Sequence, residues 1–255
     1  MSHTMLLALN TFRECVRDRI LTAVLAFGAL LVATSVVLAP LTLGESSKVI
    51  RDLGLFAISL FSMLMIILIG TGMVYREIEG RTIQTILTHP VRRASFILGK
   101  FFGLYATVLV TIALLAIVYF AVVQIFGGGM DRNLPLAITI AAMEALIVTA
   151  IALFFSTVAS PFLSAIFTFF VFVAGHLAGD LKELVQRFES ESVELLATVM
   201  YFVLPSLHQF DVRNNVLSGI PVPLEQVFHC LTYTVLYSTA VLLLTILAFQ
   251  KRDFE

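Results

Sequence analysis

One acidic side chain lies deep within a long apolar stretch of the sequence. Glu144 stands in the run Ala141-Ala142-Met143-Glu144-Ala145. A carboxyl group inside a lipid bilayer costs several kcal/mol unless it is paired, hydrated or protonated, so a functional role is the default hypothesis. A structural hydrogen bond to a neighbouring helix, or a protonated acid, explains the residue equally well.

Three histidines and one cysteine in the second half of the chain are possible ligands for a soft metal ion: His176, His208, His229 and Cys230. We expect all four on the same side of the molecule, where they could approach one another. Their spacing matches no metal signature, so coincidence is the favoured interpretation and we predict no metal site. No Ser-His-Asp or His-Glu-x-x-His pattern suggests hydrolysis, and we predict that the chain is not an enzyme.

The most polar stretch of the predicted cytoplasmic face runs from Arg76 to Arg93. Within it, Gly80 can end one helix and Thr82 can cap the next. Pro90 suits the first turn of a further helix. The stretch therefore predicts a short helix between two longer ones.

This short helix has an apolar ridge formed by Ile83, Ile86 and Leu87, with a polar opposite face. The polar face carries Arg81, Gln84, Thr85 and Thr88. An apolar ridge in a charged frame is typical of a docking helix. The alternative is a solvated loop whose apolar face rests on lipid headgroups.

The composition identifies the elements that must position these residues as membrane helices. Of the 255 residues, 59% are hydrophobic and only 13% are charged, and the mean hydropathy is +1.00. Soluble domains are about half apolar and a quarter charged, so a soluble fold is excluded. The net charge of −1 gives no indication of nucleic acid binding.

Six apolar windows are long enough to cross a bilayer, which requires about 20 residues for each helix. They are residues 20–43, 53–75, 101–126, 134–158, 161–178 and 227–249. Every lipid-facing backbone group must be bonded within its own segment, and the windows lack the alternating polarity of barrel strands. We predict an all-α polytopic membrane protein with one transmembrane domain over residues 1–255.

The basic residues orient these spans. Ten of the sixteen fall on one side: Arg13, Arg17, Arg19, Arg76, Arg81, Arg92, Arg93, Lys100, Lys251 and Arg252. Because positive residues are enriched in cytoplasmic segments, this side should be cytoplasmic and should hold both termini. An even number of spans requires the termini to share a side, which agrees with the charge distribution.

Two further segments are not expected to cross the membrane. Residues 1–19 predict an amphipathic helix at the cytoplasmic interface, with an apolar stripe that includes Met5, Leu9 and Phe12. The alternative is a simple extension of the first span. The external segment Asp180–Gln226 contains the apolar decamer Leu195–Leu204, which is too short to span and suggests a re-entrant piece. A lid over the bundle is the plainer interpretation of the whole segment.

The stretch from Glu79 to Arg93, followed by Gly99-Lys100, resembles the cytoplasmic loop of ABC-2 type transporter permeases. In that family an acidic residue and Gly-Thr precede a short apolar run and Pro-Val, and basic residues and Gly-Lys follow. Here Arg81 separates Gly80 from Thr82. The resemblance extends over the N-terminal helix, the six spans, the re-entrant segment and the ending Phe249-Gln250-Lys251-Arg252-Asp253.

The resemblance implies two permease subunits and two cytoplasmic ATPase subunits, with the loop helix as the element that couples them. The coupling residues so implied are Glu79, Gly80, Arg81, Thr82, Ile83, Ile86, Leu87, Pro90, Arg92 and Arg93. The chain has no G-x-x-x-x-G-K-[ST] motif, since Gly99-Lys100 is followed by Phe101 and lacks the preceding glycine. ATP and Mg²⁺ are therefore expected in a partner ATPase, and no cofactor is expected in this chain.

The resemblance implies a homodimeric or heterodimeric permease of the bacterial inner membrane, surrounded by lipid and acting as an exporter. One alternative is a membrane anchor or assembly factor of an envelope complex that moves no solute. Another is a proton-coupled secondary transporter centred on Glu144, which predicts an internal repeat that the sequence does not show.

Overall fold

The computed structural model describes residues 3–41, 45–79, 93–129, 131–185 and 204–250. All regular elements in these ranges are helices, which confirms the predicted all-α fold class for them. The elements are α1 (His3–Arg17), α2 (Arg19–Leu38), η1 (Ala39–Leu41), α3 (Ser46–Met65), η2 (Ile66–Gly70), α4 (Thr71–Glu79), α6 (Arg93–Phe126), α7 (Asn133–Val158), α8 (Pro161–Val185), η3 (Leu207–Phe210), α10 (Arg213–Leu217) and α11 (Leu224–Gln250).

Within the described ranges, five helical stretches are long and apolar enough to cross a membrane. They are Arg19–Leu38, Ser46–Tyr75, Arg93–Phe126, Asn133–Val158 and Leu224–Gln250. The remaining predicted span, residues 161–178, corresponds to the shorter apolar part Pro161–Leu177 of α8. The chain is therefore a multi-pass helical membrane protein.

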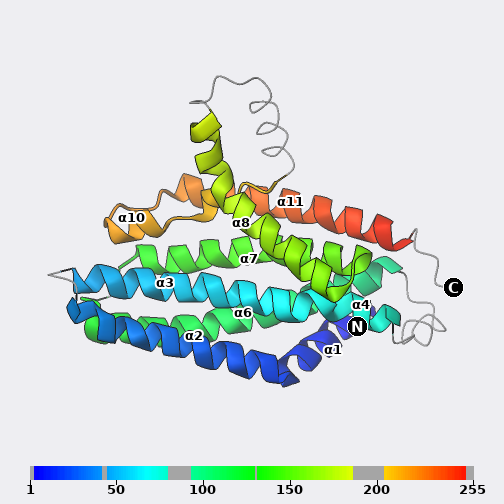
Figure 1. Cartoon of the computed structure of the whole chain (residues 1–255), viewed down its shortest axis with the longest axis horizontal. Coiled ribbons are helices and arrows are strands. Elements are labelled where there is room, and N and C mark those ends of the chain that lie inside the picture. The colour runs from blue at the N-terminus through cyan, green and yellow to red at the C-terminus, as the bar shows by residue number, and fades with distance from the viewer. Residues whose placement is uncertain (1–2, 42–44, 80–92, 130, 186–203, 251–255) are drawn as a thin grey trace.

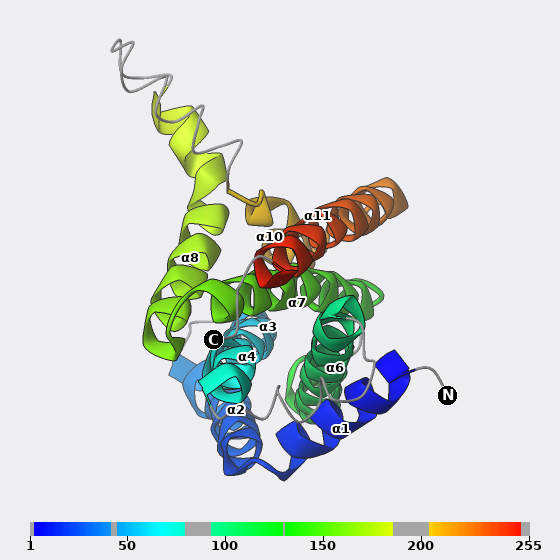
Figure 2. The same cartoon turned by 90° about the vertical axis from the view of Figure 1, so that its right-hand side faces the viewer.

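The long helices run along one common axis with α7 at the centre of the bundle (Figures 1 and 2). Helix α7 packs against α3, α4, α6, α8 and α11. The start of α1 and the end of α11 lie at one end of the bundle, and α10 lies at the other (Figure 1). We call these the inner and outer ends, because the charge distribution predicts them to be cytoplasmic and external.

Helix α1 packs along α6 through small residues. A Cβ at Gly103 of α6 would lie 2.6 Å from the Ala8 carbonyl oxygen, and one at Gly99 would lie 2.5 Å from Leu7 Cβ. Part of the apolar stripe predicted for α1 is exposed, since Met5 is 53% exposed, whereas Leu9 and Phe12 are partly buried. One face of α1 thus holds the bundle, while the other remains available to the membrane interface.

A π-helical segment, η2, interrupts the second long helix between α3 and α4. Wider turns of this kind leave backbone groups without partners in the same helix. Ser156 of α7 supplies one partner, because its hydroxyl oxygen accepts a hydrogen bond from the Val74 N–H at 3.1 Å. A side chain from the neighbouring helix therefore stabilises the irregular turn, as is required inside a membrane.

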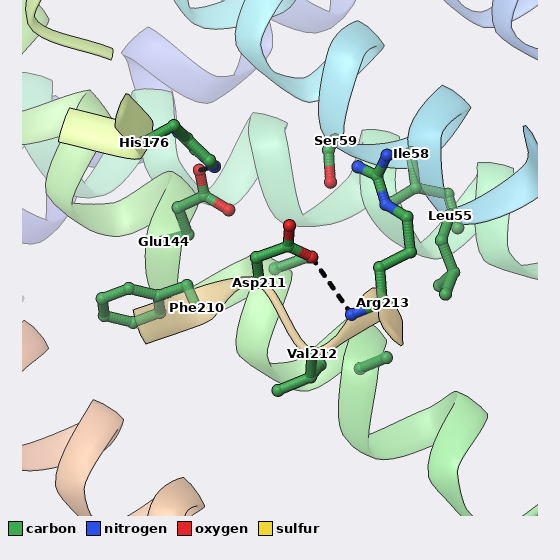
Figure 3. A pocket seen from close by; sticks show the side chains of 11 residues that line it. Leu55, Ile58, Ser59, Glu144, His176, Phe210, Asp211, Val212 and Arg213 are labelled. Atoms are coloured by element: carbon green, nitrogen blue, oxygen red, sulfur yellow. Dashed lines mark hydrogen bonds and ion pairs between the residues drawn. The ribbon is translucent and has the colours of Figure 1, made fainter. Parts of the chain in front are cut away.

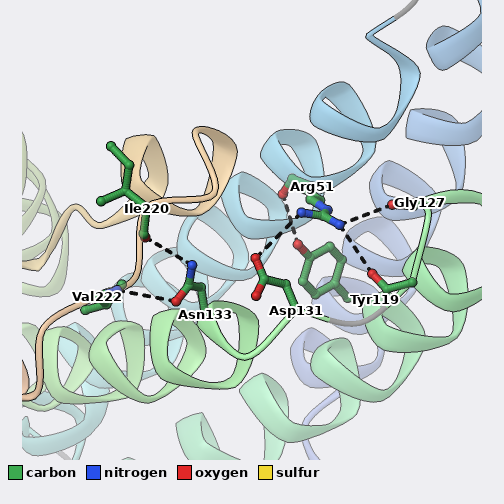
Figure 4. Close-up of polar contacts among 8 residues, drawn as sticks. Arg51, Tyr119, Gly127, Asp131, Asn133, Ile220 and Val222 are labelled. Atoms are coloured by element: carbon green, nitrogen blue, oxygen red, sulfur yellow. Dashed lines mark hydrogen bonds and ion pairs between the residues drawn. The ribbon is translucent and has the colours of Figure 1, made fainter.

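Hydrogen bonds from polar side chains connect the elements at the outer end of the bundle (Figure 4). Arg51 of α3 donates hydrogen bonds to the carbonyl oxygens of Gly127 and Gly129, and its backbone carbonyl accepts from the Tyr119 hydroxyl at 3.1 Å. The Asn133 side chain donates to the Ile220 carbonyl at 3.0 Å. These bonds tie α3, the turn between α6 and α7, and the segment before α11 together.

The segment before α11 enters the bundle rather than lying over it. Leu207, Phe210, Val216 and Val222 are all buried, and both η3 and α10 pack against α7. The predicted re-entrant decamer Leu195–Leu204 lies outside the described residues, apart from Leu204. In the described part of this segment, the residues that follow the decamer pack into the helix bundle.

Candidate functional site

Glu144 lies at the middle of α7 and is only 7% exposed. It stands 14 residues before the end of α7 at Val158, and His176 stands 15 residues after the start of α8 at Pro161. A tight turn joins α7 to α8. At about 1.5 Å per residue, each of the two side chains lies roughly 21–23 Å from this turn along its own helix, so the two lie at similar depth. The imidazole Nε2 of His176 is 3.3 Å from Oε1 of Glu144.

The tautomer of His176 follows from its second contact. Its Nδ1 lies 3.2 Å from the Phe172 carbonyl oxygen, and a carbonyl oxygen only accepts, so Nδ1 carries a proton. The neutral ring therefore turns an unprotonated Nε2 toward Glu144. A hydrogen bond between the two groups then needs one further proton, held either by the carboxyl group or by the ring.

A pocket surrounds this pair on the outer side (Figure 3). It encloses about 410 Å³, counting its open mouth, and its apolar wall includes Leu55, Ile58 and Phe210. The Ser59 hydroxyl points into it (Figure 3). The lining therefore combines apolar side chains with a few polar and charged groups around Glu144.

A second cavity of about 230 Å³ adjoins the pocket and shares Ser59, Ala141 and Glu144 with it. Its other walls include Ile66 of the π-helical segment and Phe172 of α8. Glu144 thus faces both cavities. π-Helical turns are frequent at functional sites, and here one borders the inner cavity.

Two charged residues of the segment before α11, Asp211 and Arg213, line the outer pocket. The Asp211 carboxylate accepts a hydrogen bond from the Arg213 backbone N–H at 3.1 Å. The Arg213 side chain reaches α3, where Nε lies 3.7 Å from an Asp52 oxygen and the guanidinium lies 5.5 Å from the centroid of the Phe56 ring. Residues of α3 and residues that follow η3 therefore contact one another beside the outer pocket.

A second buried charge cluster lies at the inner end. The Lys100 ammonium of α6 is 2.5 Å from an oxygen of Glu77 in α4 and 3.7 Å from an oxygen of Glu14 in α1. Its side chain is only 3% exposed. Nearby, Arg93 at the start of α6 donates a hydrogen bond to the Gln250 carbonyl at the end of α11, at 2.8 Å. These contacts anchor both helices that flank residues 80–92.

Comparison with known protein families gives one assignment. The model of the family described as "ABC-2 family transporter protein" matches residues 5–254. This chain belongs to that family. An ABC-2 transporter protein is a membrane component of an ATP-binding cassette transporter, and the resemblance of the loop residues to ABC-2 permeases is confirmed at the level of the family. A comparison with curated proteins finds no match.

Most coupling residues predicted for this ABC-2 protein lie outside the described residues. Glu79 is the last residue of α4, and Arg93 is the first of α6. The other eight lie outside the residues that the structure describes: Gly80, Arg81, Thr82, Ile83, Ile86, Leu87, Pro90 and Arg92. Their role in coupling therefore stays a prediction.

The four weak metal candidates lie in different surroundings. His176 contacts Glu144, and Cys230 Sγ lies 3.6 Å from the Gln209 carbonyl oxygen. His208 packs near Gly179, while His229 is exposed. Among the described side chains, no group of three or more His, Cys, Asp or Glu residues could hold a metal ion.

The proximity of Glu144 and His176 is the feature that sequence reasoning missed. The sequence indicates His176 only as a weak metal candidate on the external side. Their nearly equal spacing from the turn at residues 159–160 is the signal that could have paired them, because two consecutive antiparallel helices place such residues at matching depth.

Proposed function

We propose that this chain is the permease subunit of an ABC exporter, driven by ATP hydrolysis in a separate cytoplasmic ATPase. The family match over residues 5–254 carries this proposal. The absence of a phosphate-binding loop from the sequence supports a separate ATPase. Two permease copies or paralogues would pair with two ATPase subunits in the bacterial inner membrane.

The inner-end contacts support coupling through residues 80–92. Lys100 joins α4, α6 and α1, and Arg93 joins α6 to the end of α11. A force applied to the segment between α4 and α6 would therefore reach α1 and the end of α11 as well. Export rather than import rests on the resemblance to ABC-2 type permeases.

The docking ridge gives the test. In the double variant Ile83→Asp with Leu87→Asp, two carboxylates replace apolar groups that could each contribute roughly 1.5–3 kcal/mol when buried in a partner. We expect the ATPase to be lost during co-purification and its stimulation by the permease to disappear.

The matched control is Gln84→Asp with Thr88→Asp, which adds the same two charges at the same spacing on the polar face. We expect this control to retain the ATPase. Gel filtration checks that both variants remain dispersed. If the ridge variant keeps the ATPase at wild-type stoichiometry and remains stimulated, the coupling assignment is wrong. ATP hydrolysis that never responds to a permease dimer would favour an anchoring role instead.

A further inference from the structure

We propose that the two cavities around Glu144 form a binding site for a small organic amine in its ammonium form, carried on an apolar body. This inference extends the proposed export function by naming the class of ligand. It concerns binding to the permease alone, so it can be tested without any ATPase.

The first argument is the state of the Glu144 carboxyl group. Oε1 has no hydrogen-bond partner among the described residues, although the residue is only 7% exposed. The neighbouring Nε2 of His176 lies 3.3 Å away but carries no proton in the neutral tautomer. An incoming N–H donor would satisfy this oxygen, and the positive charge of an ammonium donor would favour the ionised form of the carboxyl group in a medium of low polarity.

The second argument is the aromatic lining. Phe210 lines the outer pocket and Phe172 lines the inner cavity, and Glu144 lines both. Organic cations are attracted to aromatic faces, most strongly where water is excluded. The combination of a buried carboxyl group and aromatic rings in the lining suits an ammonium group better than a neutral donor.

The third argument is the shape of the apolar wall. Leu55 and Ile58 line the outer pocket, and Met63, Ile66 and Val148 line the inner cavity. These side chains offer contact to a hydrocarbon body on either side of the carboxyl group. A bare inorganic cation would leave them without contacts, and the described residues provide no cluster of metal ligands.

The charges at the mouth favour a cation over an anion. Asp211 lines the outer pocket together with Arg213. The Arg213 guanidinium is already offset by Asp52 at 3.7 Å and lies over the Phe56 ring. Its positive charge is thus partly balanced by Asp52, while Asp211 and Glu144 contribute two carboxyl groups to the lining of the pocket.

The probe for the experiment is n-butylammonium, which is cationic at pH 7 like the lysine side chain. Its isosteres 1-butanol and butyrate carry a neutral and an anionic group on a similar body. Binding to the permease in lipid nanodiscs is followed by saturation-transfer NMR, with empty nanodiscs subtracted. We expect the ammonium ion to bind about tenfold or more tightly than the alcohol, and butyrate to bind least.

Glu144→Gln keeps the size of the side chain and should reduce ammonium binding to the level of the alcohol. The matched control is Glu225→Gln, at an exposed acid in the first turn of α11, and it should bind like the wild type. Equal binding of all three probes to the wild type overturns the proposal, whether or not the Glu144 variant folds. Undiminished ammonium binding by a folded Glu144→Gln protein overturns it as well.

The outcome is independent of the docking experiment. If the permease binds n-butylammonium more tightly than 1-butanol and butyrate but does not retain an ATPase, only the proposal of a coupled exporter is refuted. A permease that retains and stimulates its ATPase but binds the three probes alike refutes only the ligand class.

Discussion

Lys100 places a charged ammonium group almost completely out of solvent at the junction of α1, α4 and α6. Burial of a charge is tolerated only when it is paired, and removal of one partner leaves the other charge uncompensated. The second oxygen of Glu77 already lacks a hydrogen-bond partner among the described residues. The pair is therefore sensitive to single substitutions.

We expect Lys100→Met to lower the free energy of unfolding by about 3–5 kcal/mol, and the addition of Glu77→Gln to restore part of that loss. Unfolding of the purified protein in mixed micelles of increasing SDS fraction gives the measurement. Lys48→Met is the control, because Lys48 and Glu45 form an exposed pair with side chains 51% and 63% exposed. That control should cost about 1 kcal/mol or less. Equal losses in the two single variants would contradict the buried-pair argument.

Cys15 offers a test of burial at the same junction. Burial raises the pKa of its thiol to about 11 from an ordinary value of 9.0, although a hydrogen bond with Thr107 opposes the shift. Alkylation requires the thiolate, which at neutral pH is then about a hundredfold scarcer than in an exposed cysteine.

We expect maleimide labelling of Cys15 in a Cys230→Ala background to be slow at pH 7 and to keep rising with pH beyond 9. In SDS the same thiol should label rapidly, and its pH dependence should level off near 9, where an ordinary thiol titrates. Fast labelling of the folded protein at pH 7 would show that α1 does not remain packed on α6.

At the level of elements, the contact between α1 and α6 depends on the absence of side chains at Gly99 and Gly103. Atoms of the α1 backbone lie where a Cβ would stand, since the Ala8 carbonyl oxygen is 2.6 Å from that position at Gly103. The backbone of a helix cannot move aside as a flexible side chain can. The two helices therefore need glycine at this point.

Gly103→Ala should destabilise the protein by about 1–3 kcal/mol, even though alanine favours a helix by about 1 kcal/mol over glycine. Gly70→Ala is the matched control, because the nearest atom to its new Cβ is the end of the Leu104 side chain at 2.8 Å. We expect the control to cost clearly less in the same SDS unfolding assay. A larger loss for Gly70→Ala would reverse the argument.

For the whole molecule, the arrangement of helices places the start of α1 and the end of α11 at the same end of the bundle (Figure 1). This agrees with an even number of crossings. The excess of basic residues at that end predicts that it faces the cytoplasm. The opposite end then carries η3, α10 and the rest of the segment before α11.

Cysteine labelling in whole cells tests this orientation. With the native cysteines replaced, a cysteine at Glu191 should react with a membrane-impermeant maleimide from outside, and a cysteine at Glu255 should react only after the membrane is opened. Labelling of both positions from the same side would contradict the six-span topology. The reason for the expected result is the distribution of ten of sixteen basic residues.

The sequence by itself determined the helical class, the position of the long apolar segments and the family. Hydrophobic length suffices for the spans, because lipid requires every backbone group to be bonded within its own helix. The segment from Ser46 to Tyr75 also carried a π-helical turn that hydropathy could not indicate. Periodicity likewise found the apolar stripe of α1 that includes Met5, but not the face that packs on Gly103.

Only the tertiary structure decided which polar groups meet. Glu144 was recognised from its apolar neighbours, yet its contact with His176 depends on the rotation of two helices about their axes, and hydropathy carries no information on that rotation. The same holds for Lys100, whose partners come from α1 and α4. Pairing across helices is fixed by the packing of side chains in three dimensions, and a linear pattern records only the depth at which each group lies.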